Sequence, residues 1–464
     1  MIDQHTICAI TTAPGMGAIA TIRLSGTEAI AITDSIFRSP NDGKILANQP
    51  ANTLHFGQIQ DSLEVIDEVV VALFRTPHSY TGEDVVEISC HGSVFIQQQI
   101  LQLLINSGAR LAKPGEFTQR AFLNGKMDLS QAEAVADLIT SQSAAAHVVA
   151  LKQMKGGISG EIKQLRDELL SFISLVELEL DFSEEDVEFV NRESLLQLID
   201  RIDQLINNLT QSFKYGNAIK NGIPVAIIGD ANVGKSTLLN LLLREEKAIV
   251  SEIAGTTRDV IEDVIVIEGI QFRFIDTAGI RNTTDTIETM GIERTFSKIE
   301  QADIVLILID AISSTPDNLF VKNQVLNKIE GKDCALVINK IDIANDQSLR
   351  RVVEEARKYN MPVFRISARE NINIDELVEF LLHSVNKKGY SEKDVIITNV
   401  RHYEALTHAG ESIERVIEGL KKGISGDFLS QDIRECLHYL GEITGEISTD
   451  EVLGNIFKNF CIGK

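Results

Sequence analysis

The sequence predicts a multidomain protein that combines the α/β and all-α classes, with two α/β domains and one helical domain that is split along the chain. Short strands and helices mix over residues 1–120, and strands alternate with helices again over residues 222–385. Residues 121–221 and 386–464 show helical periodicity instead. Because neither helical segment can bury its apolar face alone, we expect the two to pack together, with the second α/β domain inserted between them.

Two kinds of sequence pattern predict that the first domain belongs to the α/β class. Period-two alternation predicts strands, and apolar residues at helical spacing predict helices. The expected strands cover residues 18–25, 64–74 and 85–91, and the expected helices cover residues 27–37 and 93–107. Residues 15–20 fit the dinucleotide-binding pattern G-x-G-x-x-A, but a strand pattern follows where that motif requires a helix, so we reject it.

A phosphate-binding loop is the most informative motif of the chain. Residues 229–236 match G-x-x-x-x-G-K-[ST], and they lie between an expected strand at residues 225–228 and a helical pattern at residues 237–243. In such a loop backbone N–H groups surround the β-phosphate, Lys235 adds charge toward the β and γ oxygens, and the Ser236 hydroxyl ligates Mg²⁺. The other expected nucleotide contacts of this segment are Asn232, Val233, Gly234 and Thr237.

A second motif indicates which base is bound. Residues 339–342 read Asn-Lys-Ile-Asp and follow an apolar strand pattern at residues 334–338. Asp342 can accept hydrogen bonds from the guanine N1–H and 2-amino groups, which adenine lacks. Asn339 can reach N7 or O6, and the stem of Lys340 can cover the base, so we expect guanine. A loop that resembles the fifth GTPase motif, whose backbone contacts guanine O6, contains Ser367, Ala368 and Arg369.

Two further motifs lie between these. Residues 276–279 read Asp-Thr-Ala-Gly after an expected strand, and Asp276 is expected to hold Mg²⁺ through water while Gly279 senses the γ-phosphate. Residues 255–259 read Gly-Thr-Thr-Arg-Asp and supply Thr257 as a second Mg²⁺ ligand. Five motifs in this order, on the right elements, predict a GTPase. The remaining contacts expected from the Asp-Thr-Ala-Gly segment are Thr277 and Ala278.

Composition restricts the location and the partners. The net charge of −23 and the pI near 4.9 exclude a surface that coats nucleic acid generally, because non-specific binding depends on neutralising phosphates. Any contact with RNA must therefore be local or supplied by a partner. No apolar run approaches the roughly 20 residues that span a bilayer, and the N-terminus lacks a basic signal region. Five scattered cysteines without zinc spacing suit a reducing compartment, so we expect a cytoplasmic protein without membrane contact.

The motifs together resemble those of one family. Thr-Gly-Glu-Asp at residues 81–84, Pro-Gly-Glu-Phe at residues 114–117, the Gly-Thr-Thr-Arg-Asp segment and a terminal Cys-Ile-Gly-Lys at residues 461–464 are similar to the MnmE (TrmE) tRNA-modification GTPases of the TrmE-Era-EngA-YihA-Septin-like superfamily. The resemblance covers the whole chain. One departure is Ala231, where relatives often have proline, and it removes no phosphate ligand.

The resemblance implies an N-terminal domain of the tetrahydrofolate-binding type that forms a homodimer, and a P-loop GTPase domain inserted in the helical domain. It also implies a heterotetramer with an FAD-dependent partner, MnmG. The complex would install a carboxymethylaminomethyl or aminomethyl group at C5 of the wobble uridine, position 34, of certain tRNAs. The one-carbon unit would come from 5-formyltetrahydrofolate or 5,10-methylenetetrahydrofolate.

The resemblance also assigns folate contacts to Arg23, Glu87, Lys126 and the terminal Lys464. A carboxylate such as Glu87 can accept paired hydrogen bonds from a pterin, and cations suit the carboxylated tail of folate. From spacing alone, Arg23 and Lys126 would be interpreted as solvated surface cations. Cys461 is a candidate active-site residue without an assigned role, since such a thiol is more often inert than nucleophilic.

Hydrolysis requires groups other than those of Ras-like proteins. The residue after the Asp-x-x-Gly glycine is Ile280, which cannot orient water as glutamine does. The resemblance points to Glu288 as the carboxylate that orients water through a second water, although an exposed helix residue is the alternative. In place of an arginine finger it implies a K⁺ ion that neutralises charge between the phosphates, beside Lys235. The residues expected around this ion and the nucleotide are Asn232, Ser251, Glu252, Ile253, Ala254, Gly255 and Thr256.

Two alternatives remain at this point. A ribosome-assembly GTPase shares this type of phosphate loop, but it would leave the terminal cysteine motif and the folate-type domain unexplained. A signalling or membrane-recruited switch is the other, and the C-terminus does not suit a lipid anchor. Activity on tRNA would distinguish both alternatives from a modification enzyme.

Overall fold

The structure is a computed structural model that forms two compact units, and each is described by itself. The first unit combines Met1–Ala136, Gln153–Ile202 and His408–Lys464, and the second combines Asp137–Lys152 and Asp203–Thr407. Each unit therefore joins segments that are far apart in the sequence. The residues that the structure describes are 5–40, 43–62, 64–181, 192–230, 232–245, 263–275, 299–312, 328–385, 394–422, 424, 426–458 and 460–463.

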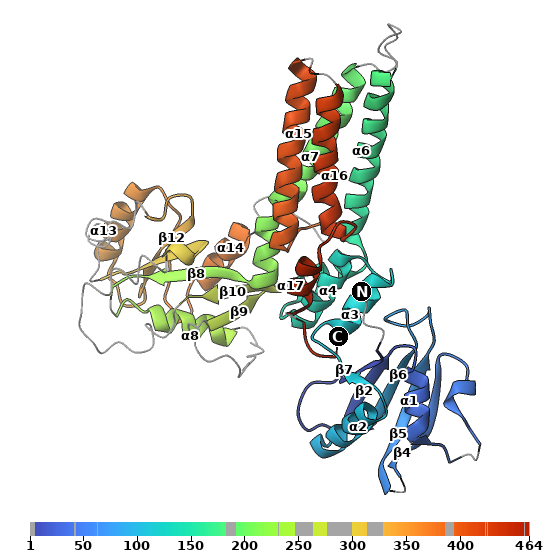
Figure 1. Cartoon of the computed structure of the whole chain (residues 1–464). Coiled ribbons are helices and arrows are strands. Elements are labelled where there is room, and N and C mark those ends of the chain that lie inside the picture. Colours follow the sequence, from blue (N-terminus) through green and yellow to red (C-terminus); the bar gives the residue numbers. More distant parts are fainter. Residues whose placement is uncertain are drawn as a thin grey trace. The chain divides into compact units, whose positions relative to one another are not determined.

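The first unit contains a seven-stranded sheet in the order β3-β4-β5-β6-β2-β1-β7 (Figure 1). Its neighbours are antiparallel except for β1 and β7, which are parallel. Helices α1 (Ala29–Ile36) and α2 (Val94–Asn106) pack on it around a core that includes Ile22, Val71 and Ile88. The strands are β1 (Ile7–Ile10), β2 (Ile19–Ser25), β3 (Phe37–Arg38), β4 (Thr53–Asp61), β5 (Glu64–Phe74), β6 (Val85–His91) and β7 (Arg110–Leu111), and a short 3₁₀ helix, η1, covers Leu46–Asn48. The three strands and two helices expected from the sequence are confirmed.

The other face of this sheet is covered near β1 by helix α3 (Glu116–Leu123). Successive residues of a strand point to opposite faces, and β1 follows this rule. Cys8 belongs to the core under α1 and α2, whereas Ile7 and Ala9 pack against Phe117 of α3. The first turn of α3 therefore lies over the β1 end of this second face.

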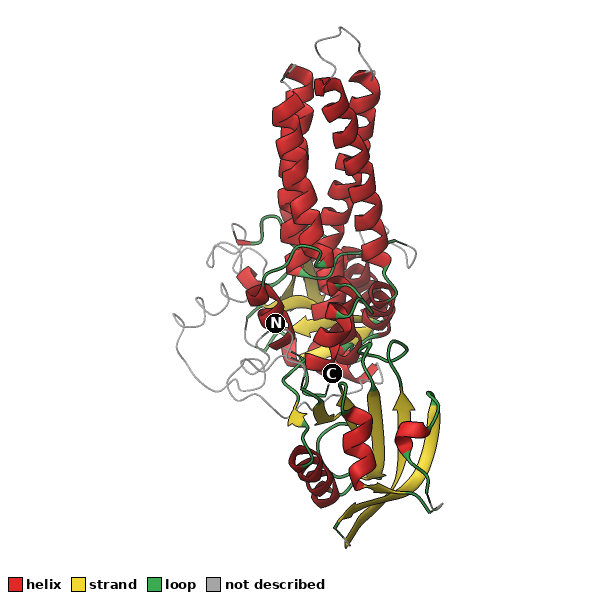
Figure 2. Ribbon diagram, turned by 45° about the vertical axis from the view of Figure 1, so that its right-hand side comes forward, coloured by secondary structure: helices red, strands yellow, loops and turns green. Residues whose placement is uncertain are grey.

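Long helices form the remainder of the first unit (Figures 1 and 2). The α6 residue Arg166 donates to the carbonyl oxygen of Leu437 on α16 at 2.7 Å, and Arg415 of α15 pairs with Asp432 of α16 at 2.7 Å. The helical segments before and after the second α/β domain therefore pack together, as the sequence predicts. The helices are α4 (Leu129–Thr140), α5 (Ala144–Met154), α6 (Gly157–Asp181), α7 (Arg192–Asn221), α15 (Val400–Lys422), α16 (Gly426–Thr444) and α17 (Asp450–Lys458), of which α5 and α7 lie mostly in the second unit.

The second unit contains a six-stranded sheet in the order β13-β12-β11-β8-β10-β9, with every neighbouring pair parallel except β9 and β10. One apolar core lies under α8 (Lys235–Glu245) and α14 (Ile374–Val385), and a second lies under α13 (Asp346–Ala356), so helices cover both faces. The other elements are β8 (Ile223–Ile228), β9 (Asp263–Ile267), β10 (Ile270–Phe274), β11 (Ile304–Asp310), β12 (Asp333–Asn339), β13 (Val363–Arg365) and the 3₁₀ helix η3 (Arg357–Tyr359). Alternating strands and helices are confirmed. No helix in the described part of the chain is both long and apolar enough to cross a membrane.

Candidate functional site

The phosphate-binding loop connects β8 to α8, at the carboxyl edge of the parallel strands where α/β proteins bind ligands. Two glycines allow the backbone of this loop to adopt its conformation. Gly229 has a φ of +152°, and a Cβ there would lie 2.2 Å from the carbonyl oxygen of Leu308. Gly234 has a φ of +101°, and a Cβ there would lie 2.2 Å from Nδ2 of Asn339. Any larger residue at either position would displace backbone or a buried amide.

Lys235, the first residue of α8, forms hydrogen bonds to the backbone at the start of this loop. Its ammonium donates to the carbonyl oxygens of Gly229 at 2.7 Å and Asp230 at 2.6 Å. Ser236 follows on the first turn of the helix and is half-buried, whereas Asn232 and Thr237 are exposed. The helix N-terminus and the lysine together make this loop an anion-binding site.

Asn339 connects the phosphate loop to the base-recognition loop. Its Nδ2 donates to the carbonyl oxygen of Val233 at 2.8 Å, and its Oδ1 accepts from the N–H of Ala368 at 2.9 Å. The side chain is almost completely buried. Ser367 is buried beside it, and Arg369 is exposed. The amide expected to contact guanine thus also joins two segments that are far apart in the sequence.

Lys340 has a partner that sequence analysis missed. Its ammonium pairs with Oδ2 of Asp310 at 2.6 Å, while Oδ1 of Asp310 accepts from the N–H of Ile312 at 2.8 Å. Asp310 ends β11 at the position that pairs with Asn339 at the end of β12. An alignment of the carboxyl ends of the two strands would have found it. Asp342 is exposed two residues further along, at the same edge of the sheet.

Several predicted residues lie outside the described residues. They include both segments expected to respond to the γ-phosphate, the proposed water-orienting acid and the terminal lysine. These residues are Ala231, Ser251, Glu252, Ile253, Ala254, Gly255, Thr256, Thr257, Asp276, Thr277, Ala278, Gly279, Ile280, Glu288 and Lys464.

In the first unit, Arg23 and Glu87 are neighbours across β2 and β6. Nε of Arg23 donates to Oε1 of Glu87 at 2.8 Å, and Nη2 forms an ion pair with the same oxygen at 2.8 Å. The guanidinium also lies over two rings, 5.4 Å from the centroid of Tyr80 and 5.7 Å from that of Phe117. Sequence analysis missed both rings. Lys126 is exposed, and its ammonium donates to the carbonyl oxygen of Pro77 at 2.9 Å.

The C-terminal tail docks on the same part of the first unit. The N–H of Gly115, just before α3, donates to the carbonyl oxygen of Cys461 at 3.4 Å. Gly115 has a φ of +68°, and a Cβ there would lie 2.7 Å from the carbonyl oxygen of Phe457. Gly463 has a φ of +99°, and its Cβ would lie 2.4 Å from the carbonyl oxygen of Ile10, which ends β1. The tail therefore runs between the start of α3 and the end of β1, close to the strand that carries Arg23.

Cys461 differs from the other four cysteines, all of which the structure describes. Its side chain is exposed, and none of the five forms a disulfide. Burial raises the pKa of Cys8, Cys90 and Cys334 to about 11 and that of Cys436 to about 12, so these thiols stay protonated and unreactive at neutral pH. Cys461 is thus the cysteine best placed to meet a ligand.

The sheet, the phosphate loop and the Asn-Lys-x-Asp edge define the class of the protein, a P-loop GTPase. Two family models match: "MnmE helical domain" over residues 129–461 and "GTP-binding protein TrmE N-terminus" over residues 6–126. The chain belongs to the MnmE (TrmE) family.

Full-length relatives agree with this assignment. The protein named tRNA modification GTPase MnmE from Bacteroides fragilis is 57% identical over 466 residues, and its namesake from Bacteroides thetaiotaomicron is 56% identical over 467 residues. Both alignments cover 100% of this chain and 100% of the relative. The crystal structure of Aquifex aeolicus Era bound to GDP and AlF4⁻ is 32% identical, covers 40% of this chain and 65% of that chain, and has a TM-score of 0.27.

Gly234→Ala should weaken GTP binding by at least about tenfold, because its Cβ would enter the space of the Asn339 amide that holds the loop. Gly331→Ala is the matched control. Gly331 also has a positive φ, +78°, but a Cβ there meets nothing within 4 Å. Titration of a fluorescent GTP analogue gives both dissociation constants. Equal weakening in the two variants would show that backbone strain, not the contact with Asn339, explains the loss.

Gly115→Ala should release the tail, because its Cβ would collide with Phe457 of α17. Gly125→Ala imposes the same left-handed strain, with a φ of +69°, in open space. Hydrogen exchange of peptides that cover α17 and the tail should accelerate markedly in Gly115→Ala and little in Gly125→Ala. Unchanged protection in Gly115→Ala would contradict the docking described above.

Proposed function

We propose that this GTPase modifies tRNA. With the FAD-dependent partner MnmG it installs a carboxymethylaminomethyl or aminomethyl group at C5 of the wobble uridine, position 34, and a 5-formyl- or 5,10-methylenetetrahydrofolate supplies the one-carbon unit. The observation that carries the proposal is that the tail with Cys461 docks in the first unit against the end of β1, which pairs with the strand β2 of Arg23, and Arg23 in turn pairs with Glu87 of β6. The names of the full-length relatives, tRNA modification GTPase MnmE, support tRNA as the substrate.

The phosphate loop is proposed to bind the triphosphate of GTP. Lys235 would exchange the carbonyl oxygens of Gly229 and Asp230 for phosphate oxygens, which are stronger acceptors. The Ser236 hydroxyl, on the first turn of α8, is the hard oxygen donor that suits Mg²⁺, with Thr257 as second protein ligand and Asp276 acting through water. When bound, Mg²⁺ neutralises charge on the β- and γ-phosphates.

A monovalent ion is proposed to replace the arginine finger. Asn232 has a left-handed φ of 64° and an exposed side chain within the phosphate loop, so its amide oxygen is free to face a cation beside the phosphates. K⁺ would be held by this oxygen together with Ser251, Ile253 and Thr256, and Glu288 would orient the attacking water. When bound, K⁺ stabilises the charge that develops between the β- and γ-phosphates.

The folate is proposed to bind at the Arg23–Glu87 pair. The hydrogen bond from Nε of Arg23 and the ion pair of its Nη2 both involve Oε1 of Glu87, and among the described residues Oε2 has no hydrogen-bond partner. A half-buried carboxylate with a free oxygen fits the 2-amino and ring N–H donors of a pterin. Lys126 and the terminal Lys464 would pair with the carboxylates of the folate tail.

The proposed organisation follows from the same assignment. Residues 1–120 form the folate-binding and dimerisation domain, residues 222–385 the GTPase domain, and residues 121–221 and 386–464 the helical domain. The active assembly is a homodimer of this chain joined to MnmG in a heterotetramer. We propose that the reaction takes place in the cytoplasm, where a tRNA substrate would be met.

Deletion of residues 461–464 tests the proposed function. It removes groups of the proposed folate site but no nucleotide ligand, so GTP hydrolysis should be retained and modification of tRNA by the protein reconstituted with MnmG should be lost. Hydrolysis is followed by phosphate release and modification by mass spectrometry of digested tRNA. A truncated protein that modifies tRNA as fast as the parent would contradict the role of the tail.

Turnover in two salts tests the proposed ion site. Hydrolysis by the parent should be at least about tenfold faster in K⁺ than in Na⁺ at equal ionic strength, because Na⁺ is too small for a site built for K⁺. Asn232→Ala should remove this preference while Mg²⁺ is saturating. A parent that does not distinguish the salts, or an alanine variant that still does, would rule the ion site out.

A further inference from the structure

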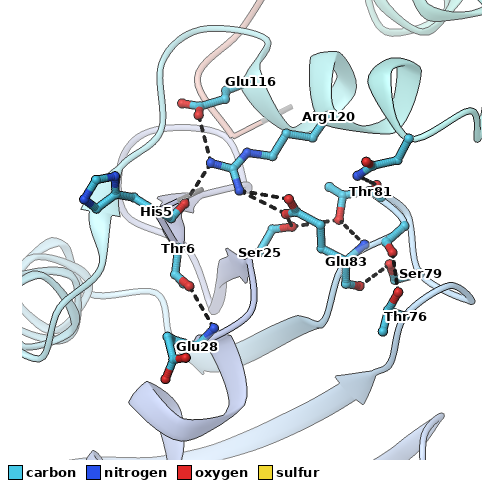
Figure 3. Close-up of polar contacts among 12 residues, drawn as sticks. His5, Thr6, Ser25, Glu28, Thr76, Ser79, Thr81, Glu83, Glu116 and Arg120 are labelled. Atoms are coloured by element: carbon cyan, nitrogen blue, oxygen red, sulfur yellow. Dashed lines mark hydrogen bonds and ion pairs between the residues drawn. The ribbon is translucent and has the colours of Figure 1, made fainter. Parts of the chain in front are cut away.

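The rings beside Arg23 are held by a buried network that the nucleotide and tail assignments leave unused. Arg120 of α3 is almost fully buried, and its guanidinium donates to both carboxylate oxygens of Glu83, at 3.0 and 3.1 Å, and to Oε1 of Glu116 at 3.1 Å (Figure 3). It also donates to the carbonyl oxygen of His5 at 2.8 Å. Removing such charges from water is costly unless they are paired and hydrogen-bonded, and here they are.

The network fixes the loop that carries Tyr80. Ser25 of β2 donates to Glu83 at 2.7 Å and shares a hydrogen bond of 2.7 Å with Thr81 (Figure 3). Ser79 donates to the carbonyl oxygen of Glu83 at 2.5 Å. Thr81 and Glu83, after Tyr80, are thus bound to the sheet, Glu83 is bound through Arg120 to α3, and Ser79, before Tyr80, is bound to Glu83. The ring between them cannot shift without breaking buried polar contacts.

Tyr80 itself connects this loop to the Arg23–Glu87 pair. Its hydroxyl shares a hydrogen bond of 2.8 Å with Thr118 of α3, and its ring lies under the guanidinium of Arg23. Burial raises the pKa of Tyr80, although the bond with Thr118 and the charge of Arg23 oppose the shift, so the phenol stays neutral at physiological pH. A neutral aromatic ring that is held at its backbone and at its hydroxyl can pack against a cation.

We propose that Tyr80 is a positioning residue of the folate site. Its ring holds the guanidinium of Arg23 where Nε donates to Oε1 of Glu87 and Nη2 pairs with the same oxygen, and Oε2 is thereby left for the ligand. The inference rests on the proposed function, because it assumes that the ligand at this pair is a tetrahydrofolate. The Glu83–Arg120 network acts indirectly, because it holds the loop that carries the Tyr80 ring.

The test compares two variants that separate the ring from the hydroxyl. Tyr80→Phe keeps the ring and should bind 5-formyltetrahydrofolate nearly as tightly as the parent. Tyr80→Leu loses the cation–π contact and should bind it about tenfold more weakly, as measured by calorimetry. Phe95→Leu is the matched control, since Phe95 is an exposed ring of α2 and the rings that lie over Arg23 are those of Tyr80 and Phe117, and it should bind like the parent. Circular dichroism and thermal unfolding report whether the first unit of each variant is folded.

A double-mutant cycle shows whether Tyr80 acts through Arg23. If it does, Tyr80→Leu should weaken binding little further once Arg23→Gln is present. If Tyr80→Leu does not fold, Tyr80→Met, which fills similar space without a ring, takes its place in the cycle. Additive losses, or a Tyr80 variant without a ring that binds like the parent, would overturn the inference.

The same data separate this inference from the proposed function. A parent that binds 5-formyltetrahydrofolate, with a loss of binding in Glu87→Gln and none in Tyr80→Leu, keeps the folate site and removes the role of Tyr80. A parent that binds no folate overturns both.

Discussion

The buried amide of Asn339 is the contact on which the nucleotide site depends. A parallel sheet places the ends of β8, β11 and β12 at one edge, but their loops have no regular structure of their own to hold them. Asn339 supplies a bond to the phosphate loop at Val233 and another to the base loop at Ala368. Since Gly234 leaves only the space that this amide occupies, the phosphate and base subsites are positioned as one structure.

In the first unit, ion pairs hold together segments that are distant in the sequence. Its candidate site combines the Arg23–Glu87 pair on two neighbouring strands, the loop around Tyr80 and the C-terminal tail. These segments come from both ends of the chain. Burial disfavours ionised Glu116, but hydrogen bonds from Arg110 and the N–H of Lys113, with the charges of Arg110 and Arg120, outweigh it and lower the pKa of Glu116. Stability from this carboxylate is therefore present above its unfolded pKa and is lost as the pH falls through the lower folded value. At neutral pH Glu116 is therefore ionised and keeps its bonds to Arg110 and Arg120.

Local patterns in the sequence predict much of the fold, and contacts between distant segments account for what they miss. The phosphate loop and the strands beside it were predictable because each motif is continuous and has a fixed context. Strand β4 was not predicted, since it contains Gly57, whose place against the ring of Phe37 is visible only once the strands pair. The roles of Asp310 and Tyr80 were not predicted from the sequence for a related reason. Their partners are at least 30 residues away, and no spacing rule connects them.

The central claim, that one chain uses GTP and a folate to modify the wobble uridine, is tested most directly in tRNA itself. Nucleosides from position 34 are measured by mass spectrometry in cells that lack this protein and in the same cells supplied with it. The account predicts that the carboxymethylaminomethyl or aminomethyl group at C5 disappears without the protein and returns with it. An unchanged nucleoside profile at position 34 in cells without the protein would contradict the account.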